Sequence, residues 1–561
     1  MKKHDRPANS SARACNKPAS TSFNMGFILF ISLSSALGGL LFGYDLLVIS
    51  GAKQFYELHF NLDSPVLQGW AVSSCIVGCI IGALGVGKAA DRYGRVKLLM
   101  VSALLFFISA IGSGYAPSFH QFIAYRLLGG IGMGMASTLS PMYIAEISPA
   151  RYRGRFVSLN QLTIVIGILL AQLINYQISE YHPVPQRIQE ECALAADLQI
   201  KTAAQSNTED NHYSQDLFTE SQRQAILNEE ILTDLPVEIV NTAELRSALR
   251  SSDPIPVSSI DLVALRKYTN QELKQTWNGT TGWRLMFAAE AIPAGLFFLL
   301  MFFVPPSPRW LTKQSRDDEA YGVLERIGGS AYATQTLKEI EATLDKEHKQ
   351  LKASAVFQRP MSKILLVGIF IAVFQQWCGI NVIFNYAPDI FRDAGFTVSG
   401  IMFSLVIIGL TNMAFTFVGM ATIDRLGRKP LMLIGSAGLL ISHLAIGWCY
   451  YSGNTGWYVV AFALLAVAVF AATLGPVAWV LISEIFPNAI RGVAMSIAVL
   501  SLWVANFILS FTFPILRDSL GPAGTFWTYA GICLVGILYI RSHIPETKGK
   551  SLEQIETELV S

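Results

Sequence analysis

Long apolar runs alternate with short polar segments along most of this chain. The runs form two sets of six, near 25–50, 66–90, 97–116, 121–145, 157–178 and 284–304, and near 363–388, 400–421, 431–451, 457–482, 493–515 and 525–543. A helix of about 20 apolar residues spans the hydrocarbon core of a bilayer. The pattern therefore predicts an all-α membrane protein with twelve transmembrane helices in two six-helix halves.

Two longer polar segments interrupt this pattern and divide the chain. The expected parts are an N-terminal tail at 1–24, a first half at 25–304, a linker with short helices at 305–360, a second half at 361–543 and a C-terminal tail at 544–561. Residues 180–282 form an insertion within the first half. Amphipathic patterns at 215–230 and 237–249 predict that this insertion is partly helical.

The positions of basic residues predict the orientation in the membrane. An even number of spans places both termini on one side, and the short loops on that side hold most of the loop Lys and Arg residues, such as Arg92, Arg153 and Arg425. Lys and Arg concentrate in cytoplasmic loops. Both termini are therefore predicted to be cytoplasmic, and the insertion, with a net charge of −8, is predicted to lie outside.

The seventh run contains a group of uncharged polar residues, namely Gln375, Gln376, Asn381, Asn385 and Tyr386. Such side chains at membrane depth are costly unless they face other helices or a water-filled cavity. They predict either a hydrogen-bonded seam between helices or the wall of a ligand cavity. Five of them within twelve positions favour the cavity, and amides with a phenol suit a neutral ligand rich in hydroxyl groups.

The same run contains Gly379 and Pro388, where a helix can unwind. In a straight helix Gln375 and Tyr386 share one face, and the two Asn residues share a different face. Unwinding would turn both faces toward one cavity.

Composition supports a membrane protein and excludes other classes. Of the 561 residues 52% are hydrophobic and 15% charged, whereas a soluble domain has about 25% charged residues. The mean hydropathy is +0.42, and the net charge of +2 argues against binding to nucleic acid. The chain has no nucleotide-binding loop and no metalloprotease motif, so we expect no enzyme activity, no cofactor and no metal.

Two motifs each occur twice at nearly the same displacement. Asp91-Arg92-Tyr93-Gly94-Arg95 recurs 333 residues later as Asp424-Arg425-Leu426-Gly427-Arg428, and Glu146-Ile147-Ser148-Pro149 recurs 338 residues later as Glu484-Ile485-Phe486-Pro487. Paired motifs at nearly one displacement indicate two homologous halves. The seventh span then corresponds to the first, so we expect the first span to be broken as well.

With further motifs, the chain resembles the sugar-porter family of the major facilitator superfamily, and most closely its bacterial proton-coupled pentose and hexose members. The resemblance extends from about Gly38 to Gly549, apart from the insertion. The further motifs are Gly43-Tyr44-Asp45, Arg126-Leu127-Leu128-Gly129-Gly130, Pro308-Arg309-Trp310, Gly475-Pro476 with Trp479, and Pro545-Glu546-Thr547-Lys548-Gly549. The resemblance implies an alternating-access transporter in the cytoplasmic membrane with one monosaccharide site between its halves, and we expect a functional monomer.

The resemblance also implies which side chains bind sugar. They are amides and indoles from five spans, namely Gln161, Gln375, Gln376, Asn381, Asn412, Trp479 and Trp503. Asn385 and Tyr386 complete this wall, since they share the polar stretch of the seventh span. Amides donate and accept hydrogen bonds as hydroxyl groups do, and indole faces pack on the C–H surface of a sugar.

A cytoplasmic gate of ionic contacts between loops is implied in the same way. Its side chains are Arg92, Glu146, Arg153, Arg309, Arg425, Glu484 and Arg491.

Three positions depart from the family pattern. Asn385 stands where the resemblance leads us to expect Tyr, Leu502 stands where a polar residue precedes the Trp of the eleventh span, and Pro306 replaces a Glu of the gate. The first two change the cavity wall, so the identity of the sugar does not carry over. The third removes one contact from the gate.

Asp45 lies within the first span, and Arg126 lies near the start of the fourth. Charges at membrane depth are costly when unpaired, so we expect these two to pair. The residues alone leave open a static ion pair or a proton relay. The resemblance favours the relay, because proton-coupled sugar porters have Asp at this position and facilitative members have a neutral residue. Asp45 would then carry the proton, and Arg126 would modulate it.

The predicted function is secondary active import of a pentose or hexose together with a proton. One alternative is facilitated sugar diffusion, with Asp45 and Arg126 in a purely structural pair. A transport-dead sugar sensor is a further alternative, which we disfavour because only 18 residues follow the last predicted span.

Overall fold

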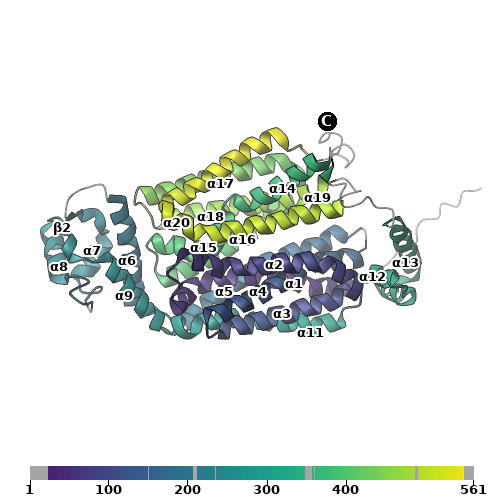
Figure 1. Cartoon of the computed structure of the whole chain (residues 1–561), viewed down its shortest axis with the longest axis horizontal. Coiled ribbons are helices and arrows are strands. Elements are labelled where there is room, and N and C mark those ends of the chain that lie inside the picture. The colour runs from purple at the N-terminus through teal and green to yellow at the C-terminus, as the bar shows by residue number, and fades with distance from the viewer. Residues whose placement is uncertain are drawn as a thin grey trace, which may run out of the picture.

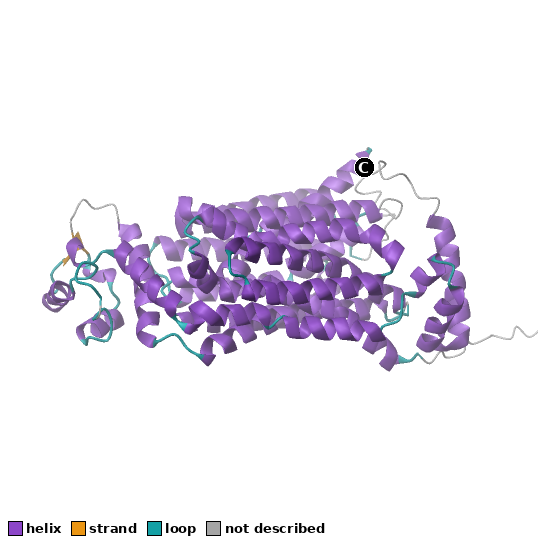
Figure 2. Ribbon diagram, turned by 60° about the horizontal axis from the view of Figure 1, so that its bottom comes forward, coloured by secondary structure: helices purple, strands orange, loops and turns teal. Residues whose placement is uncertain are grey.

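The computed structural model describes residues 23–149, 151–205, 212–233, 235–347, 357–358, 361–486 and 491–548. Expectations for residues 1–22, for the end of the C-terminal tail and for the Arg491 side chain lie outside the described residues. The described chain is almost entirely helical, and most of its helices form one elongated bundle (Figure 1, Figure 2).

The first half forms the lower layer of the bundle in Figure 1. Its first five spans are α1 (Met25–Phe60), α2 (Pro65–Tyr93), α3 (Arg95–Tyr115), α4 (Phe119–Ile147) and α5 (Arg153–Tyr181). Its sixth span, Asn278–Phe303, is assembled from η3 (Asn278–Gly282), α10 (Trp283–Ala288), α11 (Ala291–Leu300) and η4 (Met301–Phe303).

The second half forms the upper layer. Its elements are α14 (Met361–Trp377), α15 (Ile380–Asp393), α16 (Val398–Leu426), α17 (Arg428–Tyr451), α18 (Trp457–Ala472), α19 (Leu474–Glu484) and α20 (Arg491–His543). The halves approach closely where α2 meets α20. A Cβ atom on Gly69 would lie 2.3 Å from the carbonyl oxygen of Phe511, so this crossing needs a glycine.

The described residues contain eleven helices that are long and apolar enough to cross a membrane, whereas the sequence predicts twelve spans. The difference lies in α20, whose apolar part covers 51 residues, Val493–His543. At about 1.5 Å per residue this length is more than twice the thickness of the hydrocarbon core. Gly521 breaks the helix with φ +68° and ψ 171°, so α20 holds the eleventh and twelfth predicted spans.

The insertion lies at one end of the bundle, at the left of Figure 1. Its elements are α6 (Gln186–Gln205), β1 (His212–Tyr213), η1 (Gln215–Leu217), α7 (Glu220–Leu227), α8 (Thr242–Ser251), β2 (Ile255–Pro256), η2 (Val257–Ser259) and α9 (Leu262–Gln275). The strands pair antiparallel. Residues such as Leu217, Leu245 and Leu265 form a hydrophobic core separate from that of the bundle. We call this end the insertion end.

The linker helices lie at the opposite end, which we call the linker end (Figure 1). They are α12 (Pro308–Lys313) and α13 (Asp317–Glu347), and α13 is interrupted at Gly329, where φ is +81°. The N-terminus of α1 is tied to α13, because the Asn24 backbone N–H donates to the carbonyl of Ile327 at 2.9 Å.

The expectation that the first span is broken is wrong. α1 is one continuous helix of 36 residues, about ten residues longer than the apolar run at 25–50 suggests. The extension carries Lys53 and Glu57, whose charges end the apolar pattern although the helix continues. These two side chains are one helical turn apart and form an ion pair at 2.5 Å, which allows both to be buried.

The predicted break in the seventh span is confirmed. α14 ends at Trp377 and α15 begins at Ile380, with Gly379 between them in the left-handed region at φ +88°. A second irregularity falls at Tyr386 (φ −121°, ψ 15°), two residues before Pro388. The proline ring and its missing N–H disturb the preceding helical turn.

His443 on α17 stabilises the break at Gly379. Its Nε2 lies 2.8 Å from the carbonyl oxygen of Cys378. A carbonyl can only accept, so Nε2 carries the proton and donates it to a carbonyl at the interruption between the two helices. The ring is fully buried, and its role in this structure is to satisfy backbone at the broken helix.

We expect His443→Phe to lower the free energy of unfolding by about 1–3 kcal/mol, because the Cys378 carbonyl would remain buried without this donor. Thermal unfolding of the purified protein in detergent measures the effect. His443→Gln keeps a donor on a side chain of intermediate size and should recover part of the loss. Equal stability of His443→Phe and the parent protein would contradict this role.

Candidate functional site

The amides of the seventh span form a hydrogen-bonded row against α20. Gln376 Nε2 donates to Gln375 Oε1 at 2.7 Å, and Asn381 Nδ2 donates both to Gln376 Oε1 and, at 3.4 Å, to Asn506 Oδ1 of α20. One helical turn further along, Asn385 Nδ2 donates to the Ser510 hydroxyl oxygen at 3.4 Å. The predicted polar residues are therefore brought together, and in this conformation they form a seam between helices.

Tyr386 continues this seam toward the insertion end. Its hydroxyl donates to the carbonyl of Ser510, and its ring packs on Phe513 with 4.5 Å between centroids. The Lys53 ammonium group of α1 lies over the same ring, 5.2 Å from its centroid. Tyr386 thus contacts both halves.

Among the described residues, no side-chain hydrogen bond joins the remaining predicted sugar-binding residues to this row. Trp503 is buried against Phe42 of α1, with 5.8 Å between ring centroids. Asn412 on α16 is also buried. Gln161 on α5 and Trp479 on α19 have exposed side chains, 41% exposed for Trp479. The break before Trp479 falls at Thr473 (φ −133°, ψ −90°), just ahead of Gly475 and Pro476.

Asp45 and Arg126 form the expected ion pair between α1 and α4. Arg126 Nη1 contacts Asp45 Oδ1, and Nη2 donates to the Asp45 carbonyl at 3.3 Å. The thiol of Cys75 on α2 lies 3.5 Å from the other carboxylate oxygen. Both charged side chains are almost completely buried, so the pair is separated from solvent in this conformation.

A second acid, Glu290, accompanies this pair, and the sequence analysis missed it. It lies between α10 and α11, is 1% exposed, and its charge interacts with both Asp45 and Arg126. Its Oε1 has no hydrogen-bond partner among the described residues. The site therefore holds two acids for one base. The signal was available in the sequence, since Glu290 is an acid inside the apolar run at 284–304.

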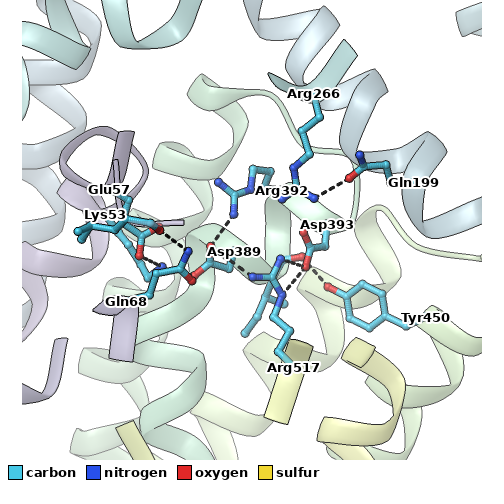
Figure 3. Close-up of polar contacts among 12 residues, drawn as sticks. Lys53, Glu57, Gln68, Gln199, Arg266, Asp389, Arg392, Asp393, Tyr450 and Arg517 are labelled. Carbon is cyan, nitrogen blue, oxygen red and sulfur yellow. Dashed lines mark hydrogen bonds and ion pairs between the residues drawn. The ribbon is translucent and has the colours of Figure 1, made fainter. Parts of the chain in front are cut away.

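A buried ionic cluster joins the halves at the insertion end (Figure 3). Lys53 of α1 contacts Glu57 on its own helix at 2.5 Å and Asp389 of α15 at 2.7 Å. The Lys53 side chain is 1% exposed and that of Asp389 is 4% exposed. Removing one partner from a buried pair costs about 3–5 kcal/mol, so separating the halves here would leave a costly unpaired charge unless another partner replaced it.

Further cations surround the carboxylates of α15. Arg392 pairs with Asp389 at 2.7 Å, and Arg517 of α20 pairs with Asp393 and approaches Asp389 at 3.7 Å. Other contacts between halves also lie toward the insertion end: the Ser399 hydroxyl donates to Glu180 Oε1 at 2.7 Å.

At the linker end, the two predicted gate carboxylates pair within their own halves. Glu146 pairs with Arg95 at 3.0 Å, and Glu484 pairs with Arg428 at 2.9 Å. Thus Arg95 and Arg428, the last residues of the repeated loop motif, contact the two predicted gate carboxylates, and the sequence analysis did not select them. The side chains of three predicted gate residues are exposed, namely Arg92, Arg153 and Arg425.

Other contributing residues were missed for identifiable reasons. Asn506 and Ser510 are four residues apart in an apolar span, the same signal that singled out the seventh span. Lys53 lies beyond the predicted end of the first apolar run, at residue 50. Nothing local in the sequence indicates that it pairs with Asp389, more than 300 residues away.

Comparison with known proteins agrees with this architecture. The family model for "Sugar (and other) transporter" matches residues 31–194 and 257–559, leaving out the middle of the insertion. The D-xylose-proton symporter of Escherichia coli is 34% identical over 570 aligned positions, covering 96% of each chain. The arabinose-proton symporter of Bacillus subtilis is 35% identical, covering 96% of this chain and 97% of the relative. The glucose transport protein of Synechocystis is 34% identical, covering 96% of this chain and 99% of the relative.

Solved structures of a related sugar transporter have the same fold as this chain. The partially occluded inward-open form of the E. coli xylose transporter is 32% identical and covers 94% of this chain and 100% of its own, with a TM-score of 0.69. Its inward-open form also has a TM-score of 0.69; it is 33% identical and covers 95% of this chain and 99% of its own. Its complex with 6-bromo-6-deoxy-D-glucose has a TM-score of 0.66; it is 33% identical and covers 96% of this chain and 100% of its own. The chain is a multi-pass membrane protein with the major facilitator fold, and it belongs to the sugar transporter family.

Proposed function

We propose that this transporter imports a pentose or hexose together with a proton across the cytoplasmic membrane by alternating access. The buried Asp45–Arg126 pair, with Glu290 beside it, is the observation that carries the proposal. Two acids around one base can hold one exchangeable proton without leaving Arg126 unpaired. The printed names of the xylose and arabinose relatives, both proton symporters, support this coupling.

The proposed mechanism opens the two ends of the bundle in turn. We assign the linker end to the cytoplasm, because α12 and α13 lie there and Lys313 of α12 pairs with Asp91 of the first basic loop motif. The buried Lys53–Asp389 ion pair between the halves lies toward the insertion end, whereas Glu146 and Glu484 at the linker end pair within their own halves. This arrangement fits an inward-facing state, in agreement with the likeness to inward-open relatives.

Sugar would bind where the amide row of the seventh span meets α20. In this conformation the amides of Gln376, Asn381 and Asn385 bond to each other and to α20. Sugar hydroxyl groups can replace these partners one for one, since hydroxyls both donate and accept. Gln161 and Trp479, which now have exposed side chains, would join the site as the halves rotate. Recognition would then be coupled to movement of α14 and α15 against α20.

Proton coupling is tested by Asp45→Asn. We expect this variant to retain sugar counterflow in proteoliposomes, because the fold and the sugar site are preserved, and to lose accumulation driven by a pH gradient. The measurement is uptake of a panel of radiolabelled pentoses and hexoses with and without a protonophore. Uphill accumulation by Asp45→Asn would exclude Asp45 as the coupling residue. Protonophore-insensitive uptake by the parent protein would favour facilitated diffusion, and no sugar movement at all would favour a sensor.

Asn385 is proposed to select the sugar, because it stands where the family resemblance leads us to expect Tyr. Asn385→Tyr adds a ring beside Ser510 and removes an amide. We expect the ratio of kcat/KM between pentoses and hexoses to change about tenfold or more, the range that one pocket contact commonly provides. Competition uptake assays measure this ratio, with Asn385→Ser as a control that keeps a small polar side chain. An unchanged ratio in Asn385→Tyr would tell against this assignment.

The Lys53–Asp389 contact is proposed to close the insertion end. Lys53→Met leaves Glu57 without its partner at 2.5 Å and removes the bridge to α15. Removing one partner from a buried pair costs about 3–5 kcal/mol. If only a third of this cost destabilised the closed insertion end, the outward-open population would rise about tenfold. The measurement is the rate at which an impermeant maleimide labels Ser50→Cys on α1, a position that is buried here.

The matched control is Lys363→Met, which removes one exposed charge at the linker end. It should leave the labelling rate unchanged, and the protein without Ser50→Cys gives the background of the native cysteines. Equal labelling rates in the Lys53→Met and parent backgrounds would contradict a closing role for Lys53.

A further inference from the structure

Two glutamines lie on one face of α5 but differ in exposure. Gln161 and Gln172 are eleven residues apart, three helical turns that return to the same side of the helix at about 100° per residue. Gln161 lies nearer the linker end, and its side chain is exposed. Gln172 lies nearer the insertion end and is 1% exposed. Of the two, the sequence analysis selected only Gln161.

Gln172 faces α16 of the second half. A Cβ atom on Gly409 of α16 would overlap with Gln172 Oε1, so the amide fills space that another residue at 409 would need. The same two helices meet again closer to the insertion end, where the ring centroids of Tyr176 and Phe403 are 6.3 Å apart. Gln172 is therefore buried in a contact between the halves, and this contact must separate when the insertion end opens.

The buried amide of Gln172 is unsatisfied in this conformation. Neither its Oε1 nor its Nε2 has a hydrogen-bond partner among the described residues. Asn175, one turn further along α5, differs in that its Nδ2 donates to the Val48 carbonyl at 3.1 Å. A buried donor and acceptor without partners destabilise a contact that an apolar side chain of the same size would fill at lower cost. The closed contact therefore gives no reason for an amide at this position.

The position of Gln172 relates it to the predicted sugar site. α16 runs from the insertion end, where Ser399 contacts Glu180, toward the linker end. Asn412, which is buried and predicted to bind sugar, follows Gly409 by one helical turn in this direction. Gln172 thus lies on the insertion-end side of Asn412, at the rim of the predicted site.

We propose that Gln172 is a further sugar-contacting residue, which binds one hydroxyl group of the sugar when the insertion end is open. A hydroxyl group both donates and accepts, so it can satisfy the amide. Closure of α5 on α16 would remove this partner and leave the unpaired amide of this structure. The inference rests on the proposed function in one respect, that the substrate is a sugar, and it does not depend on the proton.

The contact is tested one hydroxyl at a time. The assay is counterflow in proteoliposomes with the best substrate among D-xylose, L-arabinose and D-glucose, using its monodeoxy analogues as competitors. In the parent protein, loss of the hydroxyl that Gln172 binds should raise the inhibition constant about three- to tenfold, the range of one hydrogen bond. In Gln172→Met, which has a side chain of similar size without the amide, this one penalty should disappear while those for the other hydroxyls remain. Gln172→Asn, which keeps an amide, should retain part of it.

The pattern of penalties decides between a sugar contact and a purely conformational effect. Penalties that are all unchanged in Gln172→Met, or all altered by the same factor, would overturn the proposal. Movement of none of these sugars by the parent protein would contradict the proposed function as well, so the two failures are distinguishable.

Thermal unfolding without sugar provides a second readout. Gln172→Met should not lower the unfolding midpoint of the purified full chain, because the substitution removes no hydrogen bond of the closed state. A lower midpoint would show that the amide is bonded in the resting protein, for example to a buried water molecule, and would overturn the proposal. The matched control is Gln177→Met, the same substitution at an exposed position of α5, which should leave both the penalties and the midpoint unchanged.

Discussion

The cost of leaving a charge unpaired inside a membrane protein governs this structure. Asp45 with Arg126, and Lys53 with Asp389, are pairs of almost completely buried side chains. The first pair lies within one half, whereas the second joins the halves. Removing one partner from such a pair is expensive, so any movement of the halves must supply replacement partners. Protons, water or substrate at each end of the cycle can provide them.

A related cost, that of a buried backbone carbonyl without a donor, applies at the broken helix. A break at Gly379 turns the amides of the seventh span toward α20, and it interrupts the helical bonding of the backbone. His443 donates to the Cys378 carbonyl at this point. Tyr386 then extends from the irregular turn before Pro388 to contact α20, and Lys53 lies over its ring. The proposed sugar site and the ionic contact at the insertion end are therefore neighbours along α15.

Much of the fold follows from hydrophobic pattern and repeated motifs, because span length and loop charge are local properties. The break at Gly379 could be predicted because a glycine and a proline interrupt an apolar run, and the pairing of Asp45 with Arg126 because each is a charge inside an apolar run. The continuous α1 could not, since its last turns are charged and their burial depends on the ion pairs of Lys53 with Glu57 and with Asp389. Arg95 and Arg428 each stand beside a second arginine in the same loop motif, and nothing in the sequence shows which of the two pairs with a glutamate. The repeat relates the two halves in sequence, and yet α1 and the broken seventh span differ in structure.

The central claim is that sugar and proton cross together. The most direct measurement is the pH of a lightly buffered, de-energised suspension of proteoliposomes or cells when a transported sugar is added. Sugar entry down its own gradient should draw protons with it, so the external pH should rise in proportion to the sugar taken up. This rise should disappear when a protonophore is present. Sugar uptake at an unchanged external pH, with the protein active, would contradict the account.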